Sequence, residues 1–87
     1  MPLYLVERKQ AEISIEQLVT ARRAATEMSQ RFTKEGKPVR YIRVTFVPSE
    51  SRCWTLFEAL NAKVVQEVNE AAQIPFNRII EAIELLP

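Results

Sequence analysis

The fold is decided by residues 39–58, which read VRYIRVTFV, then PSES, then RCWTLFE. Apolar side chains recur at alternate positions along Val39–Val47 and again along Arg52–Glu58, a period that is typical of β-strands. The linker Pro48–Ser51 is short and polar, and a connection this short joins neighbouring strands only in antiparallel fashion. The centre of the chain therefore predicts a β-hairpin.

The segments on either side of the hairpin complete the order of elements. A helical spacing of apolar residues precedes the hairpin and another follows it, and a further alternating segment lies outside each helix. The expected elements are strands at Leu3–Arg8 and Arg78–Leu86, and helices at Ile15–Glu35 and Ala62–Ala72. The order β-α-β-β-α-β predicts an α+β, ferredoxin-like fold, with an antiparallel four-stranded sheet that carries two helices on one face.

Local signals mark the ends of the helices. Ser14 and Gln17 have the spacing of a capping box, in which each side chain satisfies a backbone amide at the start of the helix. Gly36 offers a left-handed residue at the end of that helix, just before Pro38. Asn61 is the expected N-cap of the second helix. These signals fix the first helix most firmly.

The composition fits one domain spanning residues 1–87 and excludes several kinds of site. The 87 residues are 47% hydrophobic and carry a net charge of +1, with no His, no Asp, one Gly and one Cys. Without His the chain lacks the usual base of a catalytic triad, and a zinc site of the Cys and His type is impossible within one chain. With a single Gly, neither a P-loop nor a dinucleotide fingerprint is present. We expect no cofactor and no metal.

The sequence also indicates the localisation of the protein and its partners. No apolar run is long enough for a transmembrane helix, and the first residues lack the features of a signal peptide. The lone Cys53 cannot form an internal disulfide, which fits a reducing cytoplasm. The near-zero net charge argues against a dedicated nucleic-acid binder. We expect a cytoplasmic protein with neither nucleic acid nor membrane as a partner.

Both faces of the expected sheet are largely apolar, although two helices can cover only one of them. Along Val39–Val47, for example, Val44 and Phe46 oppose Tyr41 and Thr45. A second copy of the chain is the simplest cover for the other face, as in dimeric α/β barrels, so the pattern predicts a homodimer with facing sheets. The alternative is a sheet with scattered surface aromatics.

The second sheet face is also the expected ligand site. Aromatic walls with a few convergent polar groups suit a small apolar or anionic molecule. Arg43 is the most notable member, because a guanidinium among apolar neighbours needs an anionic partner. That partner is either a ligand or a glutamate such as Glu58 or Glu84. The candidate ligand-binding residues are Tyr4, Arg8, Tyr41, Arg43, Thr45, Trp54 and Glu58.

Cysteine and glutamate are the other residue types whose side chains have the chemistry of reactive groups. Cys53 has the chemistry of a nucleophile, but no base accompanies it, and a free cysteine is more often a small buried apolar residue. Paired glutamates serve as acid and base in glycosidases. The simpler interpretation of the eleven glutamates is surface charge, and the candidates for such a role are those on strands, namely Glu7, Glu58, Glu81 and Glu84.

Four segments resemble a bacterial family of small ferredoxin-like domains of unknown function, named after a nickel-binding member. They read YLVER at residues 4–8, RYIRVTFVP at 40–48, LFEA at 56–59 and IPFNRIIEA at 74–82. The resemblance implies a ferredoxin-like fold and a dimer. It also implies nickel binding in some relatives, yet this chain has no imidazole, a preferred nickel ligand, and Val68 stands where some relatives carry His.

The leading hypothesis is a homodimeric binding or interaction domain that holds a small apolar or anionic ligand between its subunits. One alternative is a cofactor-free enzyme of the dimeric α/β-barrel type, acting as a monooxygenase, isomerase or cyclase. Another is nickel binding, which the absence of His disfavours. The weakest is single-stranded RNA binding on the sheet.

Overall fold

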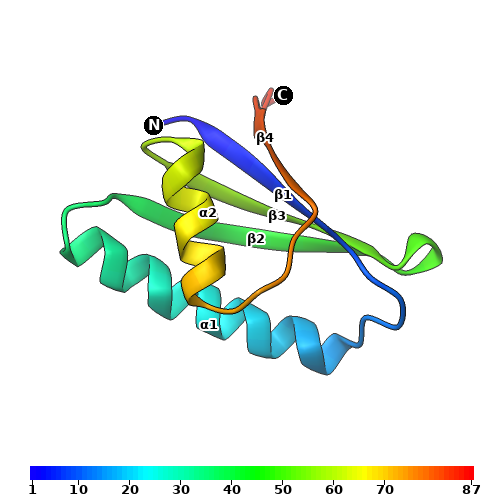
Figure 1. Ribbon diagram of the computed structural model, residues 1–87. Coiled ribbons are helices and arrows are strands. Elements are labelled where there is room, and N and C mark those ends of the chain that lie inside the picture. The colour runs from blue at the N-terminus through cyan, green and yellow to red at the C-terminus, as the bar shows by residue number, and fades with distance from the viewer.

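The computed structural model describes residues 1–87 and has the predicted order of elements. Two α-helices pack on one side of a four-stranded sheet, and both chain termini lie at the same end of the molecule (Figure 1). A 3₁₀ turn, η1, joins the strands of the hairpin. The elements are β1 (Leu3–Lys9), α1 (Ile15–Lys34), β2 (Val39–Val47), η1 (Pro48–Glu50), β3 (Arg52–Ala59), α2 (Ala62–Ala71) and β4 (Arg78–Ala82).

The sheet has the strand order β2-β3-β1-β4, and every neighbouring pair is antiparallel. β1 and β3 are the central strands, and β2 and β4 are the edges. Opposite residues of neighbouring strands point to the same face of a sheet, so the register assigns each side chain to a face. The predicted α+β βαββαβ fold with helices on one face is confirmed.

The helix ends follow the predicted signals. The side chain of Ser14 accepts from the backbone N–H of Gln17, and the side chain of Gln17 accepts from the N–H of Ser14, which completes the capping box. Gly36 has φ of 89°, the left-handed conformation that a helix stop requires. The side chain of Asn61 accepts from the N–H of Val64 and caps α2. Local chemistry therefore sets where both helices begin.

The core lies between the helices and one face of the sheet. α2 contributes Val64, Val65 and Val68, and the sheet contributes apolar residues from its three longest strands. Those sheet residues are Tyr4, Val6, Val39, Phe57 and Ala59. Because Tyr4 pairs with Phe57 across β1 and β3, it points toward the helices. The expectation that Tyr4 lies on the second face is therefore wrong.

β2 contains an irregularity that the alternation did not reveal. Tyr41 pairs with Phe57 whereas Arg43 pairs with Leu56, so Ile42 is an extra residue and forms a bulge. The bulge places Tyr41 on the helix face, where its ring meets Phe57 edge-on at 5.7 Å. Beyond the bulge, Arg43 and Thr45 lie on the second face, as predicted, and Val44 and Phe46 lie on the helix face. Tyr41 is therefore absent from the second face.

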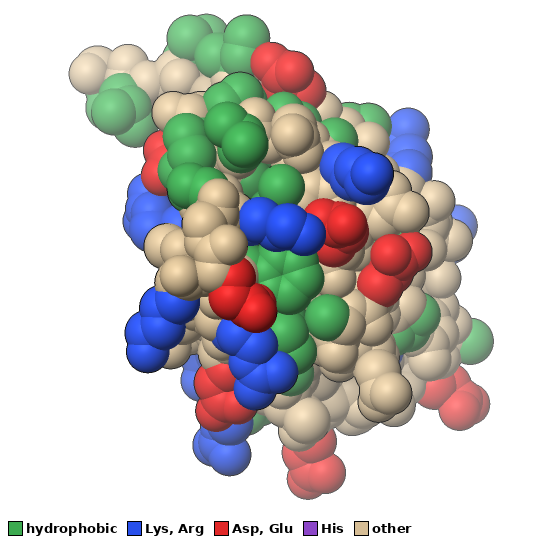
Figure 2. Space-filling model, turned by 60° about the vertical axis from the view of Figure 1, so that its left-hand side comes forward, with side chains coloured by type: hydrophobic (Ala, Val, Ile, Leu, Met, Phe, Trp, Pro, Cys, Tyr) green, Lys and Arg blue, Asp and Glu red, His purple; other side chains and the backbone are tan.

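The last strand is shorter than expected. β4 ends at Ala82, which pairs with Leu3, the first residue of β1. Residues beyond Ala82 have no partner strand, so the prediction of a strand to Leu86 is wrong. The segment 83–87, called the C-terminal tail below, exposes Ile83, Leu85 and Leu86 almost fully, at 83%, 92% and 84%. Figure 2 shows hydrophobic side chains on a projection at the end of the molecule where both termini lie.

Candidate functional site

The sheet surface opposite the helices, called the open face below, carries the best-organised polar cluster. Its centre is apolar and both ends are charged. By register it contains Leu3, Leu5 and Glu7 of β1, Arg43 and Thr45 of β2, Arg52, Trp54, Leu56 and Glu58 of β3, and Arg78, Ile80 and Ala82 of β4.

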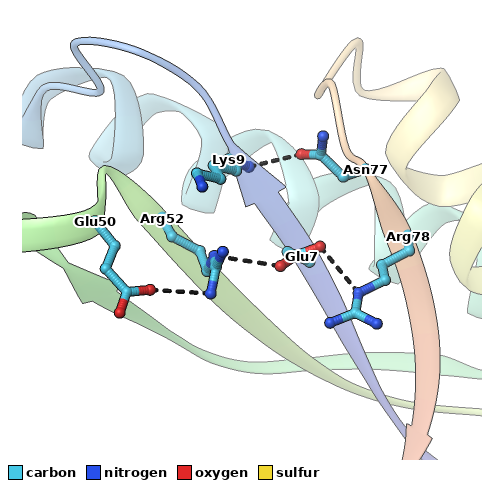
Figure 3. Close-up of polar contacts among 6 residues, drawn as sticks. All are labelled: Glu7, Lys9, Glu50, Arg52, Asn77 and Arg78. Carbon is cyan, nitrogen blue, oxygen red and sulfur yellow. Dashed lines mark hydrogen bonds and ion pairs between the residues drawn. The ribbon is translucent and has the colours of Figure 1, made fainter.

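Glu7 is the centre of the cluster and is only 8% exposed although it is a glutamate. Its Oε1 accepts from Nε of Arg78 at 3.0 Å, and its Oε2 lies 3.2 Å from Nε of Arg52 (Figure 3). Nη1 of Arg52 also lies 2.9 Å from Oε1 of Glu50. Buried carboxylates are tolerated only when such partners offset their lost hydration. The two guanidiniums therefore hold Glu7 in place on the central strand.

Backbone contacts next to Glu7 fix the same end of the sheet. The side-chain Oδ1 of Asn77 accepts from the N–H of Lys9 at 2.6 Å (Figure 3). The N–H of Asn77 donates to the carbonyl of Glu7 at 2.7 Å. These bonds join β1 to the start of β4, and they bring Arg78 beside Glu7. The guanidinium carbon of Arg78 lies 5.6 Å from the ring centre of Trp54, a cation–π distance.

The middle of the open face has a shallow depression of about 190 Å³. Its floor is Leu5, Trp54 and Leu56, and the beginning of the C-terminal tail forms one wall. Nη2 of Arg43 binds Oε1 of Glu84 at 2.6 Å across this depression. Arg43 was predicted either to pair with a glutamate or to contact a ligand. In the isolated chain it pairs with Glu84.

The structure divides the predicted ligand-binding residues between the two sides of the sheet. Arg43, Thr45 and Trp54 line the depression on the open face. Glu58 is on the same face but pairs with Arg40 at 3.3 Å. On the other side of the sheet lie Tyr4, Arg8 and Tyr41. No single pocket contains all seven predicted residues, and their role in binding stays a prediction.

Cys53 lies on the helix side and is buried, as the simpler interpretation of a lone cysteine expected. Burial raises the pKa of its thiol, and the nearby charge of Arg8 opposes that shift only in part. A thiol that keeps its proton is a poor nucleophile. The environment of Cys53 is therefore that of a packing residue.

The donor set does not fit a metal ion within one chain. No group of three or more His, Cys, Asp or Glu side chains is close enough to hold one. Glu7, the only buried carboxylate, has both oxygens occupied by guanidiniums. Neither helix has the length and apolarity needed to cross a membrane.

Sequence reasoning missed the partners of Glu7. Alternation places Glu7 on a strand but does not identify Arg52 and Arg78 as its partners. All three side chains lie on the same face of adjacent strands, and an opposite charge on each neighbour of a central strand is a usable signal. The signal requires the register of β1 against β3 and β4, which alternation alone does not supply.

Comparison with known proteins identifies a matching family and a similar solved structure. The model of a family described as "Nickel responsive protein SCO4226-like" matches residues 4–82. The crystal structure of SCO4226 from Streptomyces coelicolor A3(2) superposes with a TM-score of 0.81, covering 97% of this chain and 99% of that one at 20% sequence identity. At this identity the structural likeness supports the fold alone. No curated protein matches the chain.

Proposed function

The chain belongs to the SCO4226-like family, and from this premise we propose that it acts as a homodimeric binding domain in which the open faces of two sheets meet. The helices already cover one side of the sheet. A second copy would cover the open face. In a two-fold interface both copies use the same surface, which here is the open face. The small ligand would lie between the two sheets.

One observation carries the proposal: exposed large hydrophobic side chains continue from the open face into the C-terminal tail. Ile80 on the open face is 37% exposed, and the adjoining C-terminal tail adds three residues that are more than 80% exposed. Burying such a side chain stabilises an assembly by about 1.5–3 kcal/mol. An apolar patch that continues from the sheet into a projecting tail is typical of a protein interface.

The charges of the open face support the same arrangement. Glu7, Arg43, Arg52 and Arg78 all have partners within the chain. Charges that are already paired can be covered by a second copy without leaving an unpaired group in the interface. On the side of the molecule shown in Figure 2, acidic and basic side chains are interspersed, which does not favour a nucleic-acid partner.

The depression over Trp54 is the proposed place for a ligand. Two such depressions facing each other would enclose twice the volume of one, within the range of small-molecule pockets, about 300–1,000 Å³. The floor of Leu5, Trp54 and Leu56 suits an apolar body. An anionic group on the ligand would compete with Glu84 for Arg43.

Nickel is not part of the proposal. The family description concerns a nickel response, and a response does not require that every member coordinates the ion. This chain has no His, and its one thiol is buried among apolar residues. Imidazole and accessible thiolate are the side chains that nickel prefers.

Native mass spectrometry of the purified protein tests the proposal, because it reports the subunit number and any retained small molecule together. We expect a dimer for the wild type and monomer for Leu85→Lys. Val19→Lys is a matched control, since Val19 is also exposed but lies on α1, on the other side of the sheet. A monomeric wild type at micromolar concentration, or equal effects of the two substitutions, would refute the proposal.

A further inference from the structure

The helix layer does not close completely over the sheet. A groove of about 410 Å³ runs between the first half of α1 and the segment that follows α2. Beneath it lies a small chamber of about 20 Å³, room for one water-sized group. The groove and the chamber share four lining residues, namely Arg8, Ala21, Ile74 and Pro75. The two cavities are therefore adjacent, and Arg8 lies where they meet.

The chamber contains a polar group without a partner. The hydroxyl of Tyr41, which lines the chamber, is fully buried and makes no hydrogen bond. Burial raises the pKa of Tyr41, while the charge of Arg22 opposes the shift and that of Cys53 adds to it. Both of those side chains line the chamber as well. The hydroxyl is therefore protonated at neutral pH and is free to donate a hydrogen bond into the chamber.

The arginines of this region also lack acidic partners. On the open face and its edge, each of four arginines pairs with a glutamate: Arg40, Arg43, Arg52 and Arg78. At the groove, Nε of Arg8 donates only to the uncharged side chain of Gln10 at 3.1 Å, and Arg22 forms no ion pair. Two uncompensated guanidiniums beside a cavity favour an anion.

The remaining lining narrows the chemistry of that anion. Ala21, Ala24, Ala72, Ile74 and Pro75 give the groove apolar walls. Glu16 at the rim opposes a doubly charged group such as a phosphate monoester. Ser14 and Gln17 also line the groove, but their side chains are already engaged in the capping box of α1. These two side chains are therefore not available to a ligand.

We infer that this groove binds a small organic carboxylate, whose charged group lies between Arg8 and Arg22 and accepts a hydrogen bond from the hydroxyl of Tyr41. One carboxylate oxygen has the size that the chamber accommodates, and the apolar body of the ligand lies along the groove. The site is on the helix side of the sheet and does not depend on dimer formation through the open face.

Benzoate is a suitable probe, and benzamide is its neutral counterpart of nearly equal shape. The assay is a titration followed by amide chemical shifts of the ¹⁵N-labelled protein. We expect saturable shifts at Ala21, Ala24 and Gln73 with benzoate, and binding of benzamide weaker by about tenfold or more. Shifts at Thr45 and Ala82 instead would assign the ligand to the open face and overturn this inference without touching the proposed dimer.

Substitutions identify the partners of the carboxylate. Arg8→Gln is expected to weaken benzoate binding by about tenfold, and Tyr41→Phe by roughly fivefold. Arg22→Gln provides a second test on an exposed helix position that does not threaten folding. Arg23→Gln is the control, because Arg23 is adjacent in sequence but lines neither cavity. Absence of saturation, or equal affinities for Arg8→Gln, Arg22→Gln and Arg23→Gln, would overturn the inference.

Discussion

Replacing Glu7 with glutamine tests the polar cluster of the open face. The amide keeps the size of the carboxylate but removes its charge and one of its two acceptor oxygens. In the wild type, these oxygens lie 3.0 Å from Arg78 and 3.2 Å from Arg52. Only the contact with Arg78 is a hydrogen bond, and a hydrogen bond to a charged group contributes about 1.5–3 kcal/mol.

The expected loss lies within the range of one such bond. The side chain of Arg78 is 58% exposed and can recover hydration, and Arg52 retains Glu50 at 2.9 Å. We therefore expect Glu7→Gln to lower the free energy of unfolding by about 2 kcal/mol. With a urea dependence of about 1 kcal/mol/M for a small domain, the midpoint falls by about 2 M.

The assay is urea unfolding at pH 7, followed by circular dichroism at one fixed protein concentration. Glu58→Gln is the matched control, because its partner Arg40 is 63% exposed and the pair lies on the same sheet. An exposed pair contributes about 0–1 kcal/mol, so the control should shift the midpoint by less than half as much. Equal shifts for Glu7→Gln and Glu58→Gln would refute the assignment of Glu7 as the buried centre of the cluster.

Three further predictions follow from the buried groups and the donor set. Tyr41→Phe should raise the free energy of unfolding by about 1 kcal/mol in ligand-free protein, because it removes a buried hydroxyl without a partner. A variant that is less stable than the wild type in urea unfolding would contradict this prediction. Burial raises the folded-state pKa of Cys53 above its ordinary value of 9.0 and that of Tyr41 above its ordinary value of 10.0. The folded chain therefore holds these protons more tightly than the unfolded chain does. The free energy of unfolding consequently falls as the pH rises above these ordinary values. Melting temperatures measured from pH 7 to pH 11 should decline less steeply in the Cys53→Ser, Tyr41→Phe double variant, and parallel curves would count against the assignment. Calorimetric titration of metal-free protein with micromolar nickel should give no binding heat, and a stoichiometric signal would show that the donor set suffices after all.

Much of the fold was predictable because its determinants are local. The capping box at Ser14 and Gln17 and the left-handed Gly36 act within one turn of helix, so sequence spacing alone located the ends of α1. The short connection at Pro48–Ser51 likewise left only an antiparallel hairpin. These features determine element order, and element order with short connections largely determines this topology.

The faces of the strands were harder to predict because the sheet is apolar on both sides. A bulge at Ile42 puts Tyr41 and Arg43 on opposite faces, whereas unbroken alternation puts them on the same face, and apolar residues occur in both phases of β2. Tyr41 was consequently assigned to the wrong side. The tail had a similar ambiguity: Ile83 and Leu85 continue the alternation of β4, but the partner strand has already ended at Leu3.

The candidate site was only partly predictable for the same reason. Arg43 was recognised as a residue in need of an anionic partner, and Glu84 was one of the partners considered. The cluster around Glu7 depends on the register of three strands, and the cavity beside Tyr41 depends on how α1 and α2 cross. Both are properties of tertiary packing, which periodicity does not encode.

Acrylamide quenching of the single tryptophan tests the central proposal most directly, because Trp54 lies on the open face. If two open faces meet, Trp54 should be strongly protected in the wild type and in Val19→Lys, and readily quenched in Leu85→Lys. Equal quenching of all three proteins, together with a monomeric mass, would show that the open face faces water and that no second copy covers it.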